Sequence, residues 1–192
     1  MFPLLCCYPF ADPRVRLVEG FSEYDGVLGD TPGAPHKGID YVIQDDDTFE
    51  PFDVYAMHDG VALQGISETW GNFVALYASP LSNGDQFTTI YAHLDGIDPE
   101  LPFIPEHTQV GFGAALTVGM RLGRAGTSGA TNGIPQLHIE LHKKVFETQQ
   151  TTKLDPYGIN GRASSGRYPR PGVPLNGLQH AWVTDRPQLA ST

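Results

Sequence analysis

The sequence predicts a mainly β, single-domain protein. Glycine and proline are frequent, with 22 and 16 residues in a chain of 192, and the apolar runs between them are short. Helical periodicity is poor throughout, whereas several stretches alternate polar and apolar residues with the period of two that a half-buried strand requires. The length suits one domain with a sizeable core and additional tails.

Strands are expected where β-branched and aromatic residues run between turn signals. Asp59-Gly60 and Asn83-Gly84 are dipeptides typical of hairpin turns, and His58, beside the first of them, is expected to face solvent. The acidic stretch 45–47 is interpreted as a solvated hairpin loop, because it lacks the glycine and terminal glutamate of an EF-hand. In chain order the expected strands are 15–18, 39–43, 53–56, 60–66, 72–78, 86–92, near 118–122 and 136–142.

Two of these stretches carry residues that suit a metal. His36 and Asp40 are four positions apart, which puts them on one face of an extended chain because four is even. The last strand alternates cleanly and would place four polar side chains on one face: Gln136, His138, Glu140 and His142. Two histidines and one carboxylate are a common ligand set for catalytic zinc. Sequence alone does not bring the two stretches together in space.

Composition narrows the classes of partner. A net charge of −10 and a pI near 4.9 argue against nucleic acid, which is bound by basic surfaces. No apolar run approaches the roughly 20 residues of a membrane span. Cys6 and Cys7 are the only cysteines. Adjacent cysteines rarely bridge each other, so we expect reduced thiols or pairing with another chain.

The ordered motifs resemble the M23 (LytM/lysostaphin-type) zinc metallopeptidases of bacterial cell walls. The resemblance covers roughly residues 30 to 158 and rests on six elements taken together. In this chain they are His36-Lys-Gly-Ile-Asp40 for H-x-x-x-D, a hairpin at 54–61, Gly71-Asn72-Phe-Val for G-N-x-V, Tyr91-Ala-His93-Leu94 for Y-x-H-L, a Gly/Thr/Ser-rich loop at 123–135 and Asp155-Pro156.

The resemblance implies an antiparallel, sandwich-like β-sheet domain of the M23/LytM type with long loops around a zinc cleft. It implies that His36, Asp40 and His138 bind Zn²⁺ and that His93 is the catalytic histidine near the water that zinc activates. The second catalytic histidine of the family falls on Gln136. The expected domains are an N-terminal extension that packs on the domain (1–30), the metallopeptidase domain (31–158) and a polar, partly docked C-terminal tail (159–192).

The leading functional expectation is a zinc endopeptidase that hydrolyses peptide bonds in peptidoglycan. A glutamine does not titrate, so His93 would carry all proton transfer while Gln136 donates or accepts hydrogen bonds. The alternative is a non-catalytic or weakly active binding or regulatory domain on the same scaffold. A third possibility is a metallopeptidase that acts on a substrate outside the wall.

Further site candidates keep two interpretations each. Glu140 is either a carboxylate behind a ligand histidine or a surface acid. Tyr91 is structural or lines the cleft, and Asn72 and Trp70 touch substrate or serve turns and packing. The resemblance also implies an extracellular or cell-envelope location. Because residues 1–7 lack the features of a secretory signal, we expect a processed form or another export route, such as phage-assisted lysis.

Overall fold

The computed structural model describes residues 6–21, 36–102 and 113–156. These residues form strands, turns and irregular segments, and none of them lies in an α-helix. Within the described part of the chain, no helix is long and apolar enough to cross a membrane. The expected C-terminal tail and parts of the expected N-terminal extension lie outside the described residues.

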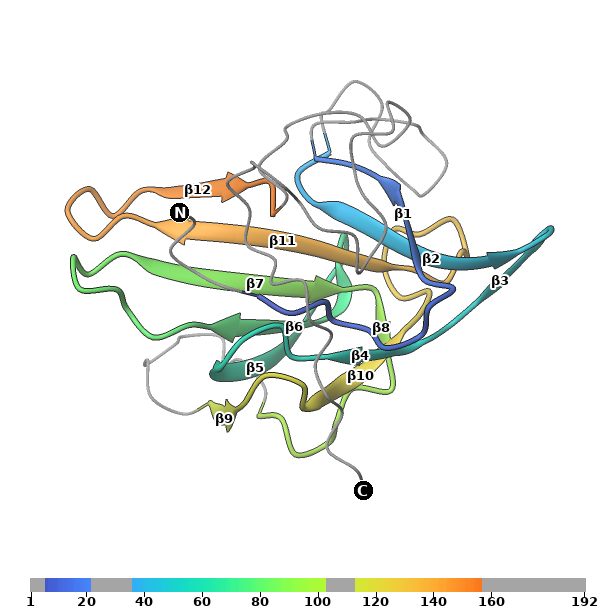
Figure 1. The fold of residues 1–192 in the computed structure, drawn as a ribbon, viewed down its shortest axis with the longest axis horizontal. Helices are drawn as coiled ribbons and strands as arrows, with labels where there is room; N and C mark the ends of the chain where they lie inside the picture. The colour runs from blue at the N-terminus through green and yellow to red at the C-terminus, as the bar shows by residue number, and fades with distance from the viewer. Residues whose placement is uncertain (1–5, 22–35, 103–112, 157–192) are drawn as a thin grey trace.

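The strands form two antiparallel sheets (Figure 1). In the larger sheet, β1, β2, β11, β7, β6, β5 and β9 follow one another; β12 also pairs with β11, and β3 with β2. The smaller sheet has the order β4, β10, β8. The bounds are β1 (Arg16–Glu19), β2 (Ile39–Asp45), β3 (Thr48–Glu50), β4 (Asp53–Tyr55), β5 (Gly60–Ser67), β6 (Gly71–Tyr77), β7 (Gln86–Ala92), β8 (Leu94–Asp95), β9 (Ala114–Leu116), β10 (Arg121–Ala125), β11 (Leu137–Lys144) and β12 (Thr151–Leu154).

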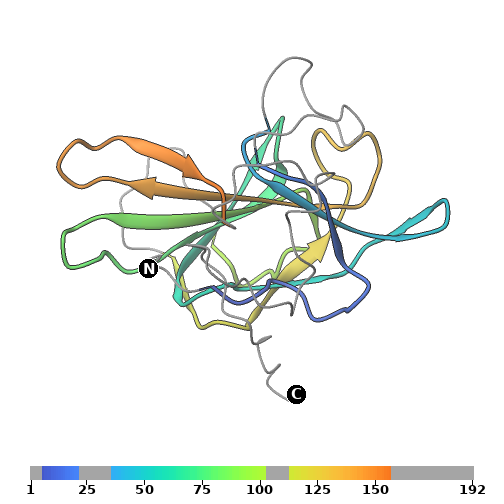
Figure 2. The ribbon, with the colours of Figure 1, turned by 45° about the horizontal axis from the view of Figure 1, so that its top comes forward.

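The main hydrophobic core is shared by the two sheets, which face each other as the sandwich-like prediction requires (Figure 2). The apolar face expected for β11 is confirmed, since its apolar residues are buried in this core. The strand is not half-buried as expected, because His138 and Glu140 on the polar face are buried as well. Core residues of the large sheet include Ile39, Tyr41, Leu76, Tyr91, Leu137, Ile139 and Leu141, and those of the small sheet Val54, Leu94, Leu122 and Ala125.

The N-terminal segment 6–21 is part of this core. Tyr8, Phe10 and Val15 are at most 2% exposed, and the ring of Phe10 packs at 4.8 Å from that of Tyr41. Each large apolar side chain buried in this way contributes about 1.5–3 kcal/mol. Neither Cys6 nor Cys7 forms a disulfide, and burial raises the pKa of the Cys6 thiol.

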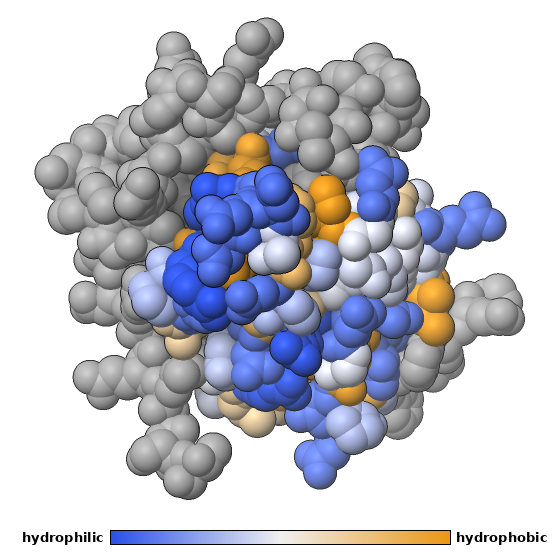
Figure 3. All heavy atoms as spheres, turned by 90° about the vertical axis from the view of Figure 1, so that its right-hand side faces the viewer, coloured by the Kyte–Doolittle hydropathy of each residue, from blue (hydrophilic) through white to orange (hydrophobic). Residues whose placement is uncertain are grey.

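The prediction for the acidic stretch 45–47 agrees with the structure, and the prediction for His58 does not. Asp45, Asp46 and Asp47 are exposed where β2 turns into β3, and hydrophilic residues dominate the described surface seen from that side (Figure 3). The prediction that His58 faces solvent is wrong. His58 is 4% exposed, because both ring nitrogens have partners within the fold: Nε2 lies 2.9 Å from the hydroxyl of Thr89 on β7, and Nδ1 lies 2.8 Å from the carbonyl oxygen of Asp59.

Candidate metal centre

Neighbouring strands bring the two histidines and the aspartate together. In the antiparallel pairing of β2 with β11, Asp40 lies directly opposite His138, so both side chains stand on the same face of the large sheet. His36 sits just before β2. A glycine is needed at position 38, between His36 and Asp40, because a Cβ there would lie 2.6 Å from Cε1 of His138 and 2.4 Å from the carbonyl oxygen of Ile139.

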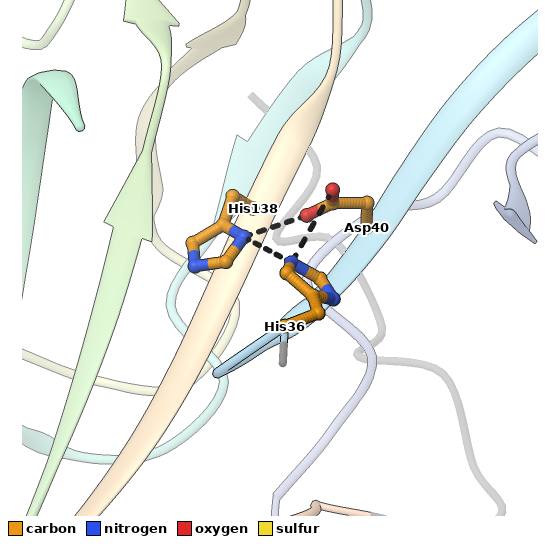
Figure 4. A group of neighbouring side chains, drawn as sticks. All are labelled: His36, Asp40 and His138. Carbon is orange, nitrogen blue, oxygen red and sulfur yellow. Dashed lines mark hydrogen bonds and ion pairs between the residues drawn. The ribbon is translucent and has the colours of Figure 1, made fainter. Parts of the chain in front are cut away.

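The side chains of these three residues turn their ligand atoms toward one another (Figure 4). Nδ1 of His138 is 2.7 Å from Oδ1 of Asp40 and 3.0 Å from Nε2 of His36, and Nε2 of His36 is 3.5 Å from Oδ2 of Asp40. Ligand bonds of 2.0–2.2 Å in a tetrahedral site place ligand atoms about 3.3 Å apart. The spacing and the chemistry of these donors therefore fit zinc.

The outer nitrogens of both imidazoles are also engaged. Nδ1 of His36 donates to the carbonyl oxygen of Gly20 at 3.0 Å, and Nε2 of His138 lies 3.3 Å from Oε1 of Glu140. Each ring is thereby fixed with its other nitrogen turned toward the three-residue cluster. Partners of this kind orient metal-binding histidines and raise their basicity.

The electrostatics of the cluster favour a bound cation. Burial lowers the pKa of His36, but the carboxylate of Asp40 and then that of Glu19 outweigh burial and raise the pKa to about 10. Burial likewise opposes the charge of Asp40, and the two imidazoles outweigh it to hold the pKa of Asp40 well below its usual range. In the protein without metal, protons thus occupy the position that a divalent cation would take.

His93 lies between β7 and β8, outside any strand. Its φ of 62° is a left-handed conformation that side chains other than glycine rarely adopt. Two backbone hydrogen bonds hold it there. The backbone N–H of His93 donates to the backbone carbonyl of Trp70 at 2.7 Å, and the carbonyl of His93 accepts from the N–H of Gly126 at 2.9 Å. Such strain is often found at functional sites.

The ring of His93 faces the metal cluster. Its centroid is 5.7 Å from that of His138, and its Nδ1–H donates to the carbonyl oxygen of Ser128 at 2.9 Å. Burial first, and then the positive charge of His138, lower the pKa of His93 to about 4. His93 is therefore neutral near pH 7, with Nε2 as its proton-accepting nitrogen.

Gln136 directly precedes β11. It forms an isolated bridge with Gly126, to whose carbonyl its backbone N–H donates at 3.0 Å. Its side chain is 1% exposed. The same loop backbone thus connects it to His93, because the N–H of Gly126 donates to the carbonyl of His93.

The structure separates the remaining candidates. Glu140 is 3% exposed and lies behind His138, so it is not a plain surface acid. Tyr91 belongs to the core, where its hydroxyl accepts from the N–H of Met57 at 2.9 Å; this supports its structural interpretation. Asn72 donates from its amide to the carbonyl of Leu94 at 3.1 Å. The indole N–H of Trp70 donates to Glu140 at 3.3 Å.

Two contributors to the site were not foreseen. Glu19 of β1 is fully buried, with Oε1 3.9 Å from Nδ1 of His36. Ser128 supplies the acceptor for His93. The sequence signal for Glu19 was an acid at the end of an apolar run, which is weak, and nothing in the sequence marks a backbone carbonyl such as that of Ser128.

A separate hollow of about 510 Å³ opens beside the small sheet, lined by Asp12, Tyr55, Arg121 and Arg124 among others. Its lining includes none of the three candidate metal ligands, nor His93 or Gln136. It is therefore distinct from the metal cluster.

The family comparison agrees with this geometry. The family model described as peptidase family M23 matches residues 34–156, well over half of the chain. The chain belongs to peptidase family M23. Its buried group of His36, Asp40 and His138 is a possible metal site of the kind on which an M23 peptidase depends. Comparison with curated proteins gives no match.

Several solved structures are similar to this M23 chain. A chain of the SpoIIQ-SpoIIIAH pore forming complex is 18% identical with a TM-score of 0.55, covering 78% of this chain and 88% of that one. Lysostaphin from Staphylococcus simulans is 19% identical (TM-score 0.49), covering 77% and 50%, and LytU is 20% identical (TM-score 0.49), covering 77% and 84%. At such identities the first of these supports the M23-like fold and nothing finer.

Proposed function

We propose that the chain is a zinc-dependent endopeptidase that hydrolyses peptide bonds in bacterial cell-wall peptidoglycan. The observation that carries the proposal is the complete ligand set of His36, Asp40 and His138, buried and within hydrogen-bond reach of one another. Family membership supports the reaction class. It also supports peptidoglycan as the substrate and a cell-envelope or extracellular location.

The chemistry divides between the ion and the chain. Zinc held by the three residues would lower the pKa of a water molecule to about 7 and polarise the scissile carbonyl. His93 serves as the base, because its Nδ1–H is committed to Ser128 and its Nε2 is left to accept a proton. Burial and then the positive charge of His138 lower the pKa of the His93 imidazole, so that its Nε2 is unprotonated at neutral pH.

We assign the second catalytic position of the family to Gln136. Its amide has donors and an acceptor but no titratable proton. It can steady the developing oxyanion or orient the water, and it leaves proton transfer to His93 alone. General acid–base catalysis is worth about 10²–10⁴-fold. Losing one of two imidazoles that share this work therefore makes a slow enzyme.

The test is zinc-dependent cleavage of cell walls. The purified chain would be stripped of metal, reloaded with one equivalent of Zn²⁺ and incubated with isolated peptidoglycan. We expect new amino termini in the released fragments by mass spectrometry, their loss with a chelator and their return with zinc. Cleavage that persists equally in chelator would exclude zinc catalysis.

One observation favours a second function. Gln136 stands where a catalytic histidine is expected, so the same scaffold also suits a non-catalytic binding or regulatory domain. Stoichiometric zinc with no turnover on walls would support that alternative. Turnover on unrelated peptides but not on walls would instead indicate a metallopeptidase with another substrate.

A further inference from the structure

The segment that precedes the family match reaches the metal centre through an irregularity in β1. Arg16 pairs with Val42 and Leu17 with Tyr41. A regular ladder would place Val18 opposite Asp40, but the register shifts and Glu19 takes that place. Bulges re-aim side chains next to active sites. Here the shift puts the carboxylate of Glu19 on the face that carries Asp40.

The end of β1 surrounds the outer nitrogen of His36. Nδ1 of His36 donates to the carbonyl of Gly20 at 3.0 Å, and Oε1 of Glu19 lies 3.9 Å from the same nitrogen. Glu19 is 0% exposed. Placing a carboxylate in so dry a position is costly unless a nearby positive charge compensates it.

Each ligand histidine has a carboxylate behind it. Behind His138, Glu140 also pairs with Lys153 at 2.6 Å and with His142 at 2.5 Å. Behind His36, Oε1 of Glu19 lies 3.9 Å from Nδ1 of the ligand itself. A divalent cation held by two neutral imidazoles and one carboxylate keeps one positive charge in excess, and Glu19 supplies the negative charge that balances it.

We propose that Glu19 is a positioning residue of the metal centre, which orients His36 and sets metal affinity from outside the family domain. The inference rests on the proposed zinc site. It implies that residues 34–156, which the family model matches, omit part of the metal centre.

The test measures zinc affinity in the full chain by competition with a chromophoric chelator. Glu19→Gln keeps the shape and removes the charge, and we expect affinity to fall about 10–100-fold. Glu19→Asp keeps the charge and should recover most of the loss. Glu147→Gln makes the same change on an exposed acid between β11 and β12 and should leave affinity unchanged.

A second measurement separates metal support from a purely structural role. Thermal unfolding in excess chelator reports the stability of the metal-free fold. We expect Glu19→Gln to have the same melting temperature as wild type in chelator and a lower melting temperature than wild type when zinc is present. Affinity of Glu19→Gln within twofold of wild type would overturn the inference. So would an equal affinity loss in both Glu19 variants accompanied by a lower melting temperature in chelator. A wild-type chain that binds no zinc would instead overturn the zinc centre itself.

Discussion

The metal-binding half and the proton-transfer half of the candidate site are built differently. Asp40 and His138 lie opposite each other on the paired strands β2 and β11, His36 lies three residues before β2, and their ligand atoms lie 2.7–3.5 Å apart. His93 and Gln136 stand outside the strands, in a left-handed turn and at an isolated bridge. Regular strand pairing fixes two of the three residues of the first half, whereas backbone hydrogen bonds of loops hold the second half.

This difference lets the two halves change independently. Loss of a ligand would leave buried charges without partners, which is strongly destabilising. Replacing an imidazole by glutamine at position 136 disturbs no ligand and leaves an amide that can still form hydrogen bonds. Under the proposed function, the chain has all three zinc ligands, and only its proton-transfer half carries glutamine in place of a histidine. Metal binding and turnover should therefore respond to different substitutions.

The largest effect is expected from Asp40→Asn. Asp40 holds both imidazoles, at 2.7 Å from His138 and 3.5 Å from His36, and a neutral amide is a poor ligand. We expect zinc affinity to fall by at least about 100-fold, more than typical losses from outer partners, and peptidase activity to fall with it. Chelator competition measures the first effect. Asp53→Asn, on an exposed acid paired with Arg121, is the control, and unchanged affinity in Asp40→Asn would refute the ligand set.

The next largest effect isolates the proton-transfer half. His93→Asn removes the base but keeps a residue type that tolerates the backbone φ of 62°. We expect kcat on peptidoglycan peptides to drop about 10²–10⁴-fold, while zinc affinity stays within a few-fold of wild type. Full activity with zinc bound would show that His93 is not the base. Joint loss of zinc and activity would show that the two halves are not separable.

The reverse substitution is expected to increase turnover. Gln136→His returns a second imidazole to the proton-transfer half without altering a ligand. We expect kcat to rise at least about 10-fold, within the range that acid–base catalysis supplies, with unchanged zinc affinity. A steady-state comparison in the same buffer measures the gain. A variant that gains nothing, on a wild type that does cut walls, would mean that glutamine already performs the role.

The sequence predicted the metal-binding half because strand periodicity is regular. The alternation from Gln136 to His142 assigned His138 to the face that carries the polar side chains, and the even spacing of His36 and Asp40 put these two on one face. The resemblance then implied that the two stretches share one metal, and the pairing of β2 with β11 brings them side by side. The fold class and most long strands followed from the same periodicity.

What escaped prediction depends on short elements and on backbone atoms. β3, β8, β9 and β12 have two to four residues each, too few for a periodic pattern. The register shift that turns Glu19 inward breaks the alternation on which strand prediction relies. His58 was placed in solvent from its turn dipeptide alone, whereas its burial depends on Thr89, 31 positions away in the chain.

The smallest predicted effect concerns how the loop half is held. Leu94 follows His93, and its carbonyl accepts from the amide of Asn72 at 3.1 Å and from the hydroxyl of Ser128 at 2.9 Å. Ser128 in turn accepts from His93. Asn72→Ala removes one of these bonds, worth about 0.5–1.5 kcal/mol. We expect kcat to fall about 2–10-fold, as this loss of alignment free energy implies, with zinc affinity unchanged.

The split between kinetic constants decides what Asn72 does. If Asn72 positions His93 through Leu94, the alanine variant loses kcat and keeps its KM. If Asn72 instead contacts substrate, KM rises while kcat is maintained. Asn83→Ala is the control, because it removes the two amide hydrogen bonds of Asn83 to Asp85 in the loop between β6 and β7. If the control variant slows turnover as much as Asn72→Ala does, the effect comes from a general loosening of the sheet. Asn72 would then not position His93.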